Sequence, residues 1–350
     1  MLPKIFREKG RKFLCFSITL TGKCNAHCSY CHFYARKARK KVMCDISEEL
    51  FESYLLFVRE VIKKFSNHKD IQVGYRFSGG EPLILGEKLF RYAQRAYEIT
   101  GEKPFILTNG KAINEEFIKI AKRYNSIGHL YVSIENPLNP DPGAPNPFAI
   151  IEKIKKFSSE DLPIVPGVVV IKNEHFKDLF KIARFLYKEL NGLPTFSERG
   201  YGLYSPPTKR QLRDLYKNIE KIITHYSQKV KIVLFPSLTS VSSLYPKFCG
   251  GWDSVYIIGL GLENKYGITR RNIKEKFPEI LEQFDSHYPH LKCEKEKCRW
   301  RDGCRRILGG WLKGWGKLLP EECMKSYCEF KKTIYKAVEN GSKHVKDLSR

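Results

Sequence analysis

Residues 20–33 read LTGKCNAHCSYCHF and place three cysteines close together, at Cys24, Cys28 and Cys31. The run KFLCFSITL that leads into them, residues 12–20, is short and apolar, which is typical of a β-strand. A loop that follows a strand of a parallel sheet lies at the carboxyl edge of that sheet, where α/β folds place their active sites. The three thiols are therefore expected on an active-site loop.

Short β-rich runs alternate with longer helical patterns between residues 12 and 235. Residues 71–77, IQVGYRF, alternate apolar side chains with period two, and residues 47–65 carry a helical apolar stripe behind a Ser47 cap. Further strands are predicted at 104–108, 127–134, 164–171 and near 200–204, with helices from Asn114, Phe148, His175 and Lys209. Right-handed crossovers join these six βα units into a parallel sheet, and six units suit a partial barrel better than the eight of a closed one.

The composition is that of a globular protein with a strong excess of positive charge. The chain has 350 residues, 42% of them hydrophobic, and 62 Lys plus Arg against 38 Asp plus Glu give a formal net charge of +24. Such a surface suits an acidic partner, which could be nucleic acid, an acidic peptide, a phosphorylated metabolite or an acidic electron donor. A solvated, lysine-rich surface without such a partner is the alternative.

The cysteine usage and the lack of a long apolar run point to a cytoplasmic protein. The eleven cysteines are an odd number and fall in clusters, which argues for metal ligation in a reducing compartment rather than for a disulfide framework. The apolar run at 13–20 lacks the small-residue cleavage site of a signal peptide. No apolar stretch approaches the roughly 18 residues that span a bilayer, so no membrane association is expected.

The loop CNAHCSYC resembles the C-x-x-x-C-x-aromatic-C loop of the radical S-adenosylmethionine (radical SAM) superfamily. The resemblance implies a [4Fe–4S] cluster on Cys24, Cys28 and Cys31, whose open iron is chelated by S-adenosylmethionine (AdoMet). It also implies reductive cleavage of AdoMet to methionine and a 5′-deoxyadenosyl radical. The three cysteines taken alone would also fit a structural zinc.

Three short motifs at the ends of predicted strands extend the resemblance. They are SGGEP at 78–82, LTNG at 107–110 and VSIEN at 132–136. In relatives the glycine pair lets the backbone approach the methionine moiety, the following Glu accepts from its ammonium, and the Ser contacts the ribose or carboxylate. The aromatic residue of the cysteine loop lies beside the adenine. The resemblance thus assigns cofactor contacts to Tyr30, Gly79, Gly80, Glu81, Asn109 and Ser133.

One segment departs from the family pattern. Close relatives follow the turn after the fourth strand with a His and an Arg that help to hold the cofactor carboxylate. This chain has NPLNPDPGAPNPF at 136–148 instead. The resemblance therefore assigns no residue to that contact.

The chain beyond residue 236 has a different composition and six of the eleven cysteines. This change in composition predicts two domains, a radical SAM partial barrel at 1–236 and a small cysteine-rich domain at 237–350. The second resembles the SPASM and Twitch extensions, which implies one auxiliary [4Fe–4S] cluster on Cys293, Cys298, Cys304 and Cys323. Cys328 could replace Cys323 as the fourth ligand, and a structural zinc is the alternative for the group.

Cys249, in the stretch KFCGGWDSVY, has three possible roles. It could be a displaced cluster ligand, a buried inert thiol, or a thiol that donates a hydrogen atom to a substrate radical. Peptide epimerases of this superfamily use such a thiol beside a single auxiliary cluster. Cys249 is therefore the candidate catalytic residue.

Relatives with SPASM-type tails mostly modify peptides or proteins, so the resemblance implies a peptide or protein substrate that is matured, crosslinked or epimerised. The basic run ARKARKK at 35–41 follows the cysteine loop and suits either an acidic peptide or RNA phosphates. Radical SAM modification of RNA or of a phosphorylated small molecule is the alternative function, and a non-catalytic iron–sulfur electron carrier is a third. A flavodoxin, ferredoxin or reductase is expected to supply the electron.

Overall fold

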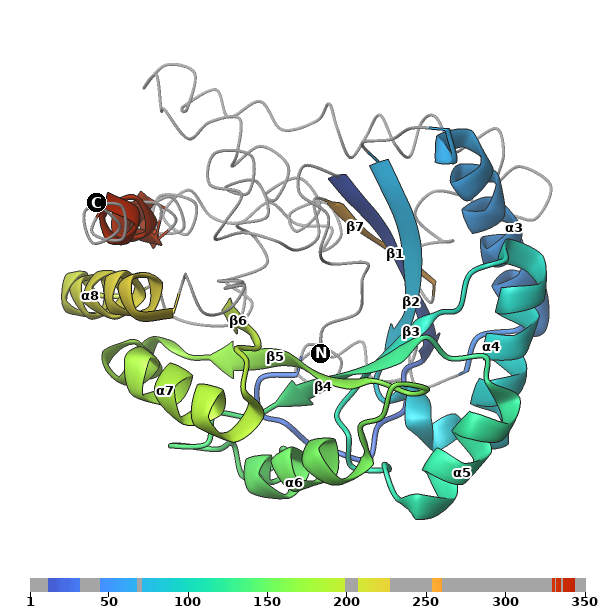
Figure 1. Ribbon diagram of the computed structural model, residues 1–350, viewed down its shortest axis with the longest axis horizontal. Coiled ribbons are helices and arrows are strands. Elements are labelled where there is room, and N and C mark those ends of the chain that lie inside the picture. Colours follow the sequence, from blue (N-terminus) through green and yellow to red (C-terminus); the bar gives the residue numbers. More distant parts are fainter. Residues whose placement is uncertain are drawn as a thin grey trace. The chain divides into compact units, whose positions relative to one another are not determined.

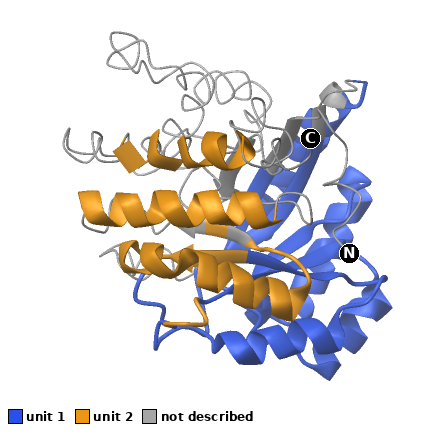
Figure 2. Cartoon of the chain, turned by 60° about the vertical axis from the view of Figure 1, so that its left-hand side comes forward, with its two compact units in different colours: residues 1–135, 140–167, 252–283 blue, residues 136–139, 168–251, 284–350 orange. Residues whose placement is uncertain are grey.

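The structure, a computed structural model, describes residues 12–31, 45–67, 71–198, 207–226, 254–259 and 329–343, with 331 and 335 excepted. The chain divides into two compact units, shown in Figure 2. Unit 1 comprises residues 1–135, 140–167 and 252–283, and unit 2 comprises residues 136–139, 168–251 and 284–350.

Unit 1 is built on parallel strands that alternate with helices along the chain. Its strands are β1 (Lys12–Thr21), β2 (Ile71–Gly79), β3 (Phe105–Thr108), β4 (His129–Ile134) and β7 (Ser254–Gly259). Its helices are α3 (Glu48–Phe65), the short 3₁₀ turn η2 (Pro82–Leu85), α4 (Glu87–Thr100), α5 (Glu115–Tyr124) and α6 (Pro147–Phe157). The strands pair in parallel in the order β7-β1-β2-β3-β4. Figure 1 shows α3, α4, α5 and α6 along the outer side of this curved sheet.

The two faces of β1 and β2 differ in chemistry because alternate side chains point to opposite sides of a sheet. Phe16 of β1 packs edge-on against Phe57 of α3, with ring centroids 5.4 Å apart, and Phe77 of β2 packs against Phe51 of α3 at 5.7 Å. These four rings are buried and form part of the core between sheet and helices. The intervening residues, such as Ser17, therefore face the side of the sheet away from α3.

Unit 2 continues the strand–helix alternation. Strand β5 (Ile164–Ile171) passes from unit 1 into unit 2 and pairs in parallel with β6 (Thr195–Glu198). The other elements are the 3₁₀ turn η3 (Asn173–Asp178), α7 (Leu179–Leu190), α8 (Lys209–Tyr226) and helical residues within 329–343. Phe330 of the last helical segment stacks on Phe176 of η3 at 5.8 Å, and both side chains are buried. The last helical segment thus packs into the core of this unit.

The α/β class with a parallel sheet, predicted from the sequence, is confirmed by the strands of the described residues. The predicted Ser47 cap is present, since Ser47 Oγ accepts from the Leu50 backbone N–H at 3.3 Å. Asn114, predicted as the start of a helix, is the cap of α5, and its Oδ1 accepts from the Phe117 backbone N–H at 2.8 Å. Helix α6 begins one residue earlier than predicted, at Pro147, because Asn146 caps it.

The last strands differ most from the prediction. The strand expected near 200–204 falls outside the described residues, and β6 lies before it, at 195–198. Strand β7 comes from beyond residue 236 and pairs with β1, with Leu14 opposite Ser254. The predicted domain boundary at 236 stays a prediction. Within the described part of the chain, no helix has both the length and the apolar character needed to cross a bilayer.

Candidate active site

The start of the cysteine loop, residues 21–23, is held by the turn that ends β2. The backbone N–H of Gly80 donates to Thr21 O at 2.7 Å, and that of Glu81 donates to Lys23 O at 2.8 Å. A Cβ atom at Gly80 would lie 2.2 Å from Lys23 O, and one at Gly79, whose φ is +143°, would lie 2.2 Å from Thr21 O. Only glycine fits such an approach. The glycine pair therefore brings this turn onto the cysteine loop, while its contact with the methionine moiety stays a prediction.

Glu81 fastens the turn after β2 to the turn after β3. Its side chain has no exposed surface. Its Oε1 accepts from the Leu83 backbone N–H at 3.0 Å and from Thr108 Oγ1 at 2.6 Å, and its Oε2 accepts from the Asn109 backbone N–H at 2.6 Å. Burial raises the pKa of the Glu81 carboxyl, and these three hydrogen bonds oppose that rise. The structure thus gives this carboxylate a positioning role, and its predicted contact with the AdoMet ammonium stays a prediction.

The turn after β3 holds the next part of the loop. Asn109 Nδ2 donates to Asn25 Oδ1 at 2.9 Å and lies 3.7 Å from Cys24 Sγ, within hydrogen-bond range for sulfur. Lys111 Nζ donates to the carbonyl oxygen of Asn25 at 3.0 Å. Asn109, predicted as a cofactor contact, therefore lies directly beside the first cysteine.

The end of β4 holds the aromatic residue of the loop. Tyr30 Oη donates to Glu135 Oε2 at 2.6 Å. Glu135 is buried, and it lies two residues after Ser133, the predicted cofactor contact. Burial raises the pKa of Tyr30, and the neighbouring Glu135 and Cys28 raise it further. The phenol therefore stays protonated and donates to the carboxylate. This bond fixes the Tyr30 ring, which is predicted to lie beside the adenine.

The loop between β4 and α6 holds the rest of the cysteine loop. The His27 backbone N–H donates to Gly143 O at 2.8 Å. The Ser29 backbone N–H donates to Asp141 Oδ1 at 3.1 Å, and Ser29 Oγ donates to Asp141 Oδ2. These contacts come from the segment 136–148 that departs from the family pattern. The ends of three successive strands thus hold successive parts of one loop.

The three thiols on this loop interact electrostatically and are partly exposed. Burial raises the pKa of Cys24, and it raises that of Cys28 to about 11, with the charges of Cys31, Glu135 and Cys24 acting in the same direction on Cys28. The thiols of Cys24 and Cys28 are therefore mostly neutral at pH 7, and iron cations would favour their thiolate forms.

A cluster with three protein ligands fits this arrangement. The Cys31 backbone N–H donates to Cys28 O at 3.0 Å, so a tight turn places these two cysteines side by side. Among the described residues, no group of three or more His, Cys, Asp or Glu side chains is arranged to hold a metal ion. The thiols of a four-iron cluster bind different irons and need not converge on a single point.

A small polar network lies below the site, on the sheet face away from α3. Arg76 Nε donates to Ser17 Oγ at 2.9 Å, and Ser17 Oγ lies 2.8 Å from Ser78 Oγ. Ser17 and Ser78 are buried, and Ser17 lies opposite Arg76 in the parallel register. No sequence motif had pointed to these residues. The alternation of polar and apolar side chains in FSITLT, residues 16–21, is the signal that could have found them.

Glu135, Asp141 and Gly143 were also missed as functional candidates. The signal for Glu135 was its position two residues after Ser133, where relatives carry an Asp. The signal for the other two was the Asp-Pro-Gly sequence, which is typical of a tight turn. No sequence signal named the cysteine loop as the partner of that turn.

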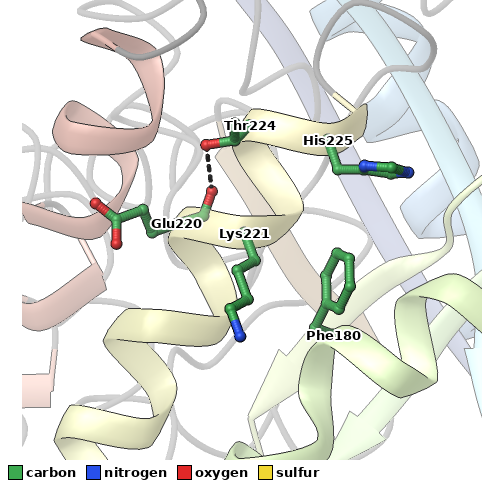
Figure 3. A pocket seen from close by; sticks show the side chains of 5 residues that line it. All are labelled: Phe180, Glu220, Lys221, Thr224 and His225. Atoms are coloured by element: carbon green, nitrogen blue, oxygen red, sulfur yellow. Dashed lines mark hydrogen bonds between the residues drawn. The ribbon is translucent and has the colours of Figure 1, made fainter.

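Unit 2 carries an open pocket of about 360 Å³, shown in Figure 3. Phe180 of α7 and Glu220, Lys221, Thr224 and His225 of α8 line it. Thr224 Oγ1 donates to Glu220 O at 2.9 Å, so this hydroxyl satisfies a carbonyl of its own helix. None of the residues predicted from the sequence lines this pocket.

Six further cysteines of the sequence analysis lie outside the described residues, namely Cys249, Cys293, Cys298, Cys304, Cys323 and Cys328. The basic run at 35–41 also lies outside them. The auxiliary cluster and the role of Cys249 therefore stay predictions.

The comparisons with known proteins agree with the site. The family model described as the Radical SAM superfamily matches residues 18–186. No curated protein matches the sequence. The solved structure "Native anSMEcpe with bound AdoMet" aligns with a TM-score of 0.63 and 16% identity over 95% of this chain and 99% of that chain. "Native anSMEcpe with bound AdoMet and Cp18Cys peptide" aligns with a TM-score of 0.62 and 17% identity, again over 95% of this chain and 99% of that chain.

At such low identity the similarity to these structures shows a shared fold. The family match begins within β1, covers the cysteine loop and extends through the strand ends that hold this loop. AdoMet and a [4Fe–4S] cluster are the cofactors expected of this family. The match over residues 18–186 indicates a radical SAM superfamily domain in that part of the chain, and the chain is an enzyme.

Proposed function

We propose that the chain modifies a peptide or protein by radical chemistry initiated at the loop Cys24–Cys31. The observation that carries the proposal is that the ends of β2, β3 and β4 each hold a successive part of this loop. A [4Fe–4S] cluster bound there would supply the electron that cleaves AdoMet to the 5′-deoxyadenosyl radical. Preorganised ligands keep such a cluster in one geometry, and catalysis depends on that geometry.

The residues around the loop supply the proposed cofactor contacts. Cys24, Cys28 and Cys31 would bind three irons, and the fourth would bind the amino and carboxylate groups of AdoMet. Backbone groups at Gly79 and Gly80 suit the methionine moiety, since no side chain blocks their approach. Ser133, at the end of β4, is the proposed ribose or carboxylate contact.

Further proposed contacts are made by side chains that already have partners. Tyr30, held by Glu135, would flank the adenine. Asn109 would lie near the ligand through its position beside Cys24. The carboxylate of Glu81, held by Thr108 and Asn109, would accept from the AdoMet ammonium. Each of these side chains is thus oriented before the cofactor binds.

A peptide is the substrate class that the observations favour. The fold is shared with anSMEcpe, and one structure of that protein is described as holding both AdoMet and a peptide. The formal net charge of +24 favours an acidic segment on the substrate. The same charge suits an acidic electron donor, for which a flavodoxin, ferredoxin or reductase is proposed.

The tail is proposed to hold one auxiliary [4Fe–4S] cluster on Cys293, Cys298, Cys304 and Cys323, with Cys328 as the alternative fourth ligand. The spacing of these cysteines supports this proposal. Such a cluster would bind the substrate or accept an electron from it. Cys249 is proposed to donate a hydrogen atom to the substrate radical.

The substrate class can be tested with mixed pools before any single substrate is known. Anaerobically reconstituted protein would be incubated with dithionite, AdoMet and either a peptide pool or an RNA pool, and 5′-deoxyadenosine would be measured by mass spectrometry. Peptides should raise its formation above the basal rate. A stimulation by RNA alone would contradict the peptide proposal and support the alternative function.

A further inference from the structure

The second cysteine of the loop is held on both sides by one turn of the β4–α6 loop. His27 precedes Cys28 and donates its backbone N–H to Gly143 O at 2.8 Å. Ser29 follows Cys28 and donates its backbone N–H to Asp141 Oδ1 at 3.1 Å. The hydroxyl of Ser29 donates to the other oxygen of the same carboxylate. The turn 141–143 therefore fixes the two backbone neighbours of a predicted iron ligand.

The turn is itself rigid before it meets the loop. Asp141 Oδ1 also accepts from the Gly143 backbone N–H at 3.1 Å, and Asp141 O accepts from the Ala144 backbone N–H at 3.0 Å. The first bond closes an Asx turn and the second a β-turn. Pro142 fixes its own φ and has no N–H to satisfy. Asp141 is 3% exposed, so its carboxylate is held in place and largely shielded from water.

The contact also depends on the absence of a side chain at Gly143. A Cβ atom there would lie 2.1 Å from His27 O and 2.6 Å from the carbonyl carbon of His27. Backbone atoms cannot give way to this extent without moving the loop. A methyl group at this position would therefore displace the residue before Cys28 while leaving every charge unchanged.

We propose that Asp141, seated by the Gly143 turn, is a positioning residue that sets the place of Cys28 and thereby the geometry in which the three-cysteine cluster presents its open iron to AdoMet. The inference rests on the proposed function and extends it to a segment in which this chain departs from its relatives. Asp141 acts through His27 and Ser29 and does not itself touch the reacting atoms.

The readout is AdoMet binding at the cluster, measured without substrate and without turnover. Full-length protein would be reconstituted and reduced, and AdoMet would be titrated while the electron paramagnetic resonance spectrum of the cluster is followed. AdoMet coordination changes that spectrum at the three-cysteine cluster only, so an auxiliary cluster does not interfere. The measured quantity is the AdoMet concentration that gives half of the spectral change.

Two different variants should move this concentration in the same direction. Asp141→Ala removes the acceptor of three donors and should raise it roughly tenfold or more. Asp141→Asn keeps an acceptor for the two backbone N–H groups, and its amide can donate to Ser29 Oγ, so it should stay within about threefold of wild type. Gly143→Ala should reproduce the shift of Asp141→Ala by a steric route.

A matched control separates positioning from general destabilisation. Leu89 is fully buried on α4, so Leu89→Ala should lower the unfolding temperature but keep the wild-type AdoMet titration. If Asp141→Ala and Gly143→Ala titrate like wild type or like Leu89→Ala, the inference is overturned while the proposed function stands. If the wild-type spectrum does not respond to AdoMet, the proposed function is overturned, and the inference with it.

Discussion

Replacing Glu81 by glutamine tests how the turns around the cysteine loop are held together. The Glu81 side chain is fully buried, and its two oxygens accept from Leu83, Thr108 and Asn109. A glutamine has the same shape but turns one acceptor into a donor. In its better orientation the new amide nitrogen, itself a donor, faces the Asn109 N–H, which loses its acceptor.

The cost follows from the number of donors left unpaired. A shielded backbone N–H without an acceptor costs roughly 1–3 kcal/mol, so Glu81→Gln should lower the free energy of unfolding by about that amount. Glu81→Ala leaves three donors unpaired and opens a cavity, and a loss of roughly 3–5 kcal/mol is expected. The exposed Glu115, paired with Lys156 on the surface of unit 1, provides the control substitution Glu115→Gln.

The assay is urea unfolding of the cluster-free protein at pH 7, followed by circular dichroism. A double-mutant cycle with Thr108→Val isolates one of the three bonds, since Thr108 should matter less once Glu81 is alanine. A Glu81→Gln protein that unfolds at the same urea concentration as wild type and as Glu115→Gln would refute the reasoning. Additive effects of Glu81→Ala and Thr108→Val would show that the two side chains do not interact.

Three further predictions concern other parts of the chain. Burial lowers the pKa of His129 to about 4, below an unfolded value of about 6.5. Because the unfolded state then binds the proton more readily, the free energy of unfolding should fall by about 2 kcal/mol between pH 7.5 and pH 5. His129→Leu should remove this difference in urea unfolding at the two pH values, and an unchanged pH dependence in the variant would contradict the prediction. Replacing Cys298 and Cys304 by alanine should reduce the iron content from about eight to about four per chain and abolish substrate turnover, while slow AdoMet cleavage continues. One zinc per chain and no second cluster in the wild-type protein would make the tail a structural zinc site. Cys249→Ala should keep the iron and still form 5′-deoxyadenosine but divert the substrate radical. The wild-type product formed in deuterated water should gain one deuterium, and loss of iron from the variant would instead make Cys249 a cluster ligand.

The strand and helix pattern could be predicted because it depends on residues close in sequence. Ser47 and Asn114 cap helices that begin at the next residue, and each cap is satisfied within three residues. Residues 71–77, whose period-two pattern predicts a strand, form most of β2, and Phe77 of this strand packs on α3. Local burial patterns and local caps carry this information in a single sequence.

The parts that were missed depend on contacts between distant residues. Asp141 and Ser29 are 112 positions apart, and nothing in either neighbourhood names the other. The place of strand β7 beside β1 depends on the path of the chain. The glycine pair at 79–80 was predicted from a motif, yet its closest observed approach is to the backbone of residues 21–23. Side-chain partners across a sheet edge follow from topology, which a single sequence specifies only indirectly.

The formation of 5′-deoxyadenosine by protein variants of the cysteine loop tests the central claim most directly. Wild-type protein and a variant with Cys24, Cys28 and Cys31 all replaced by alanine would be reconstituted anaerobically, reduced with dithionite and supplied with AdoMet. The wild type should hold about eight irons and release 5′-deoxyadenosine and methionine in equal amounts, whereas the variant should hold about four irons and release neither. Undiminished 5′-deoxyadenosine from the variant, or none from a wild type with its full iron content, would contradict the account.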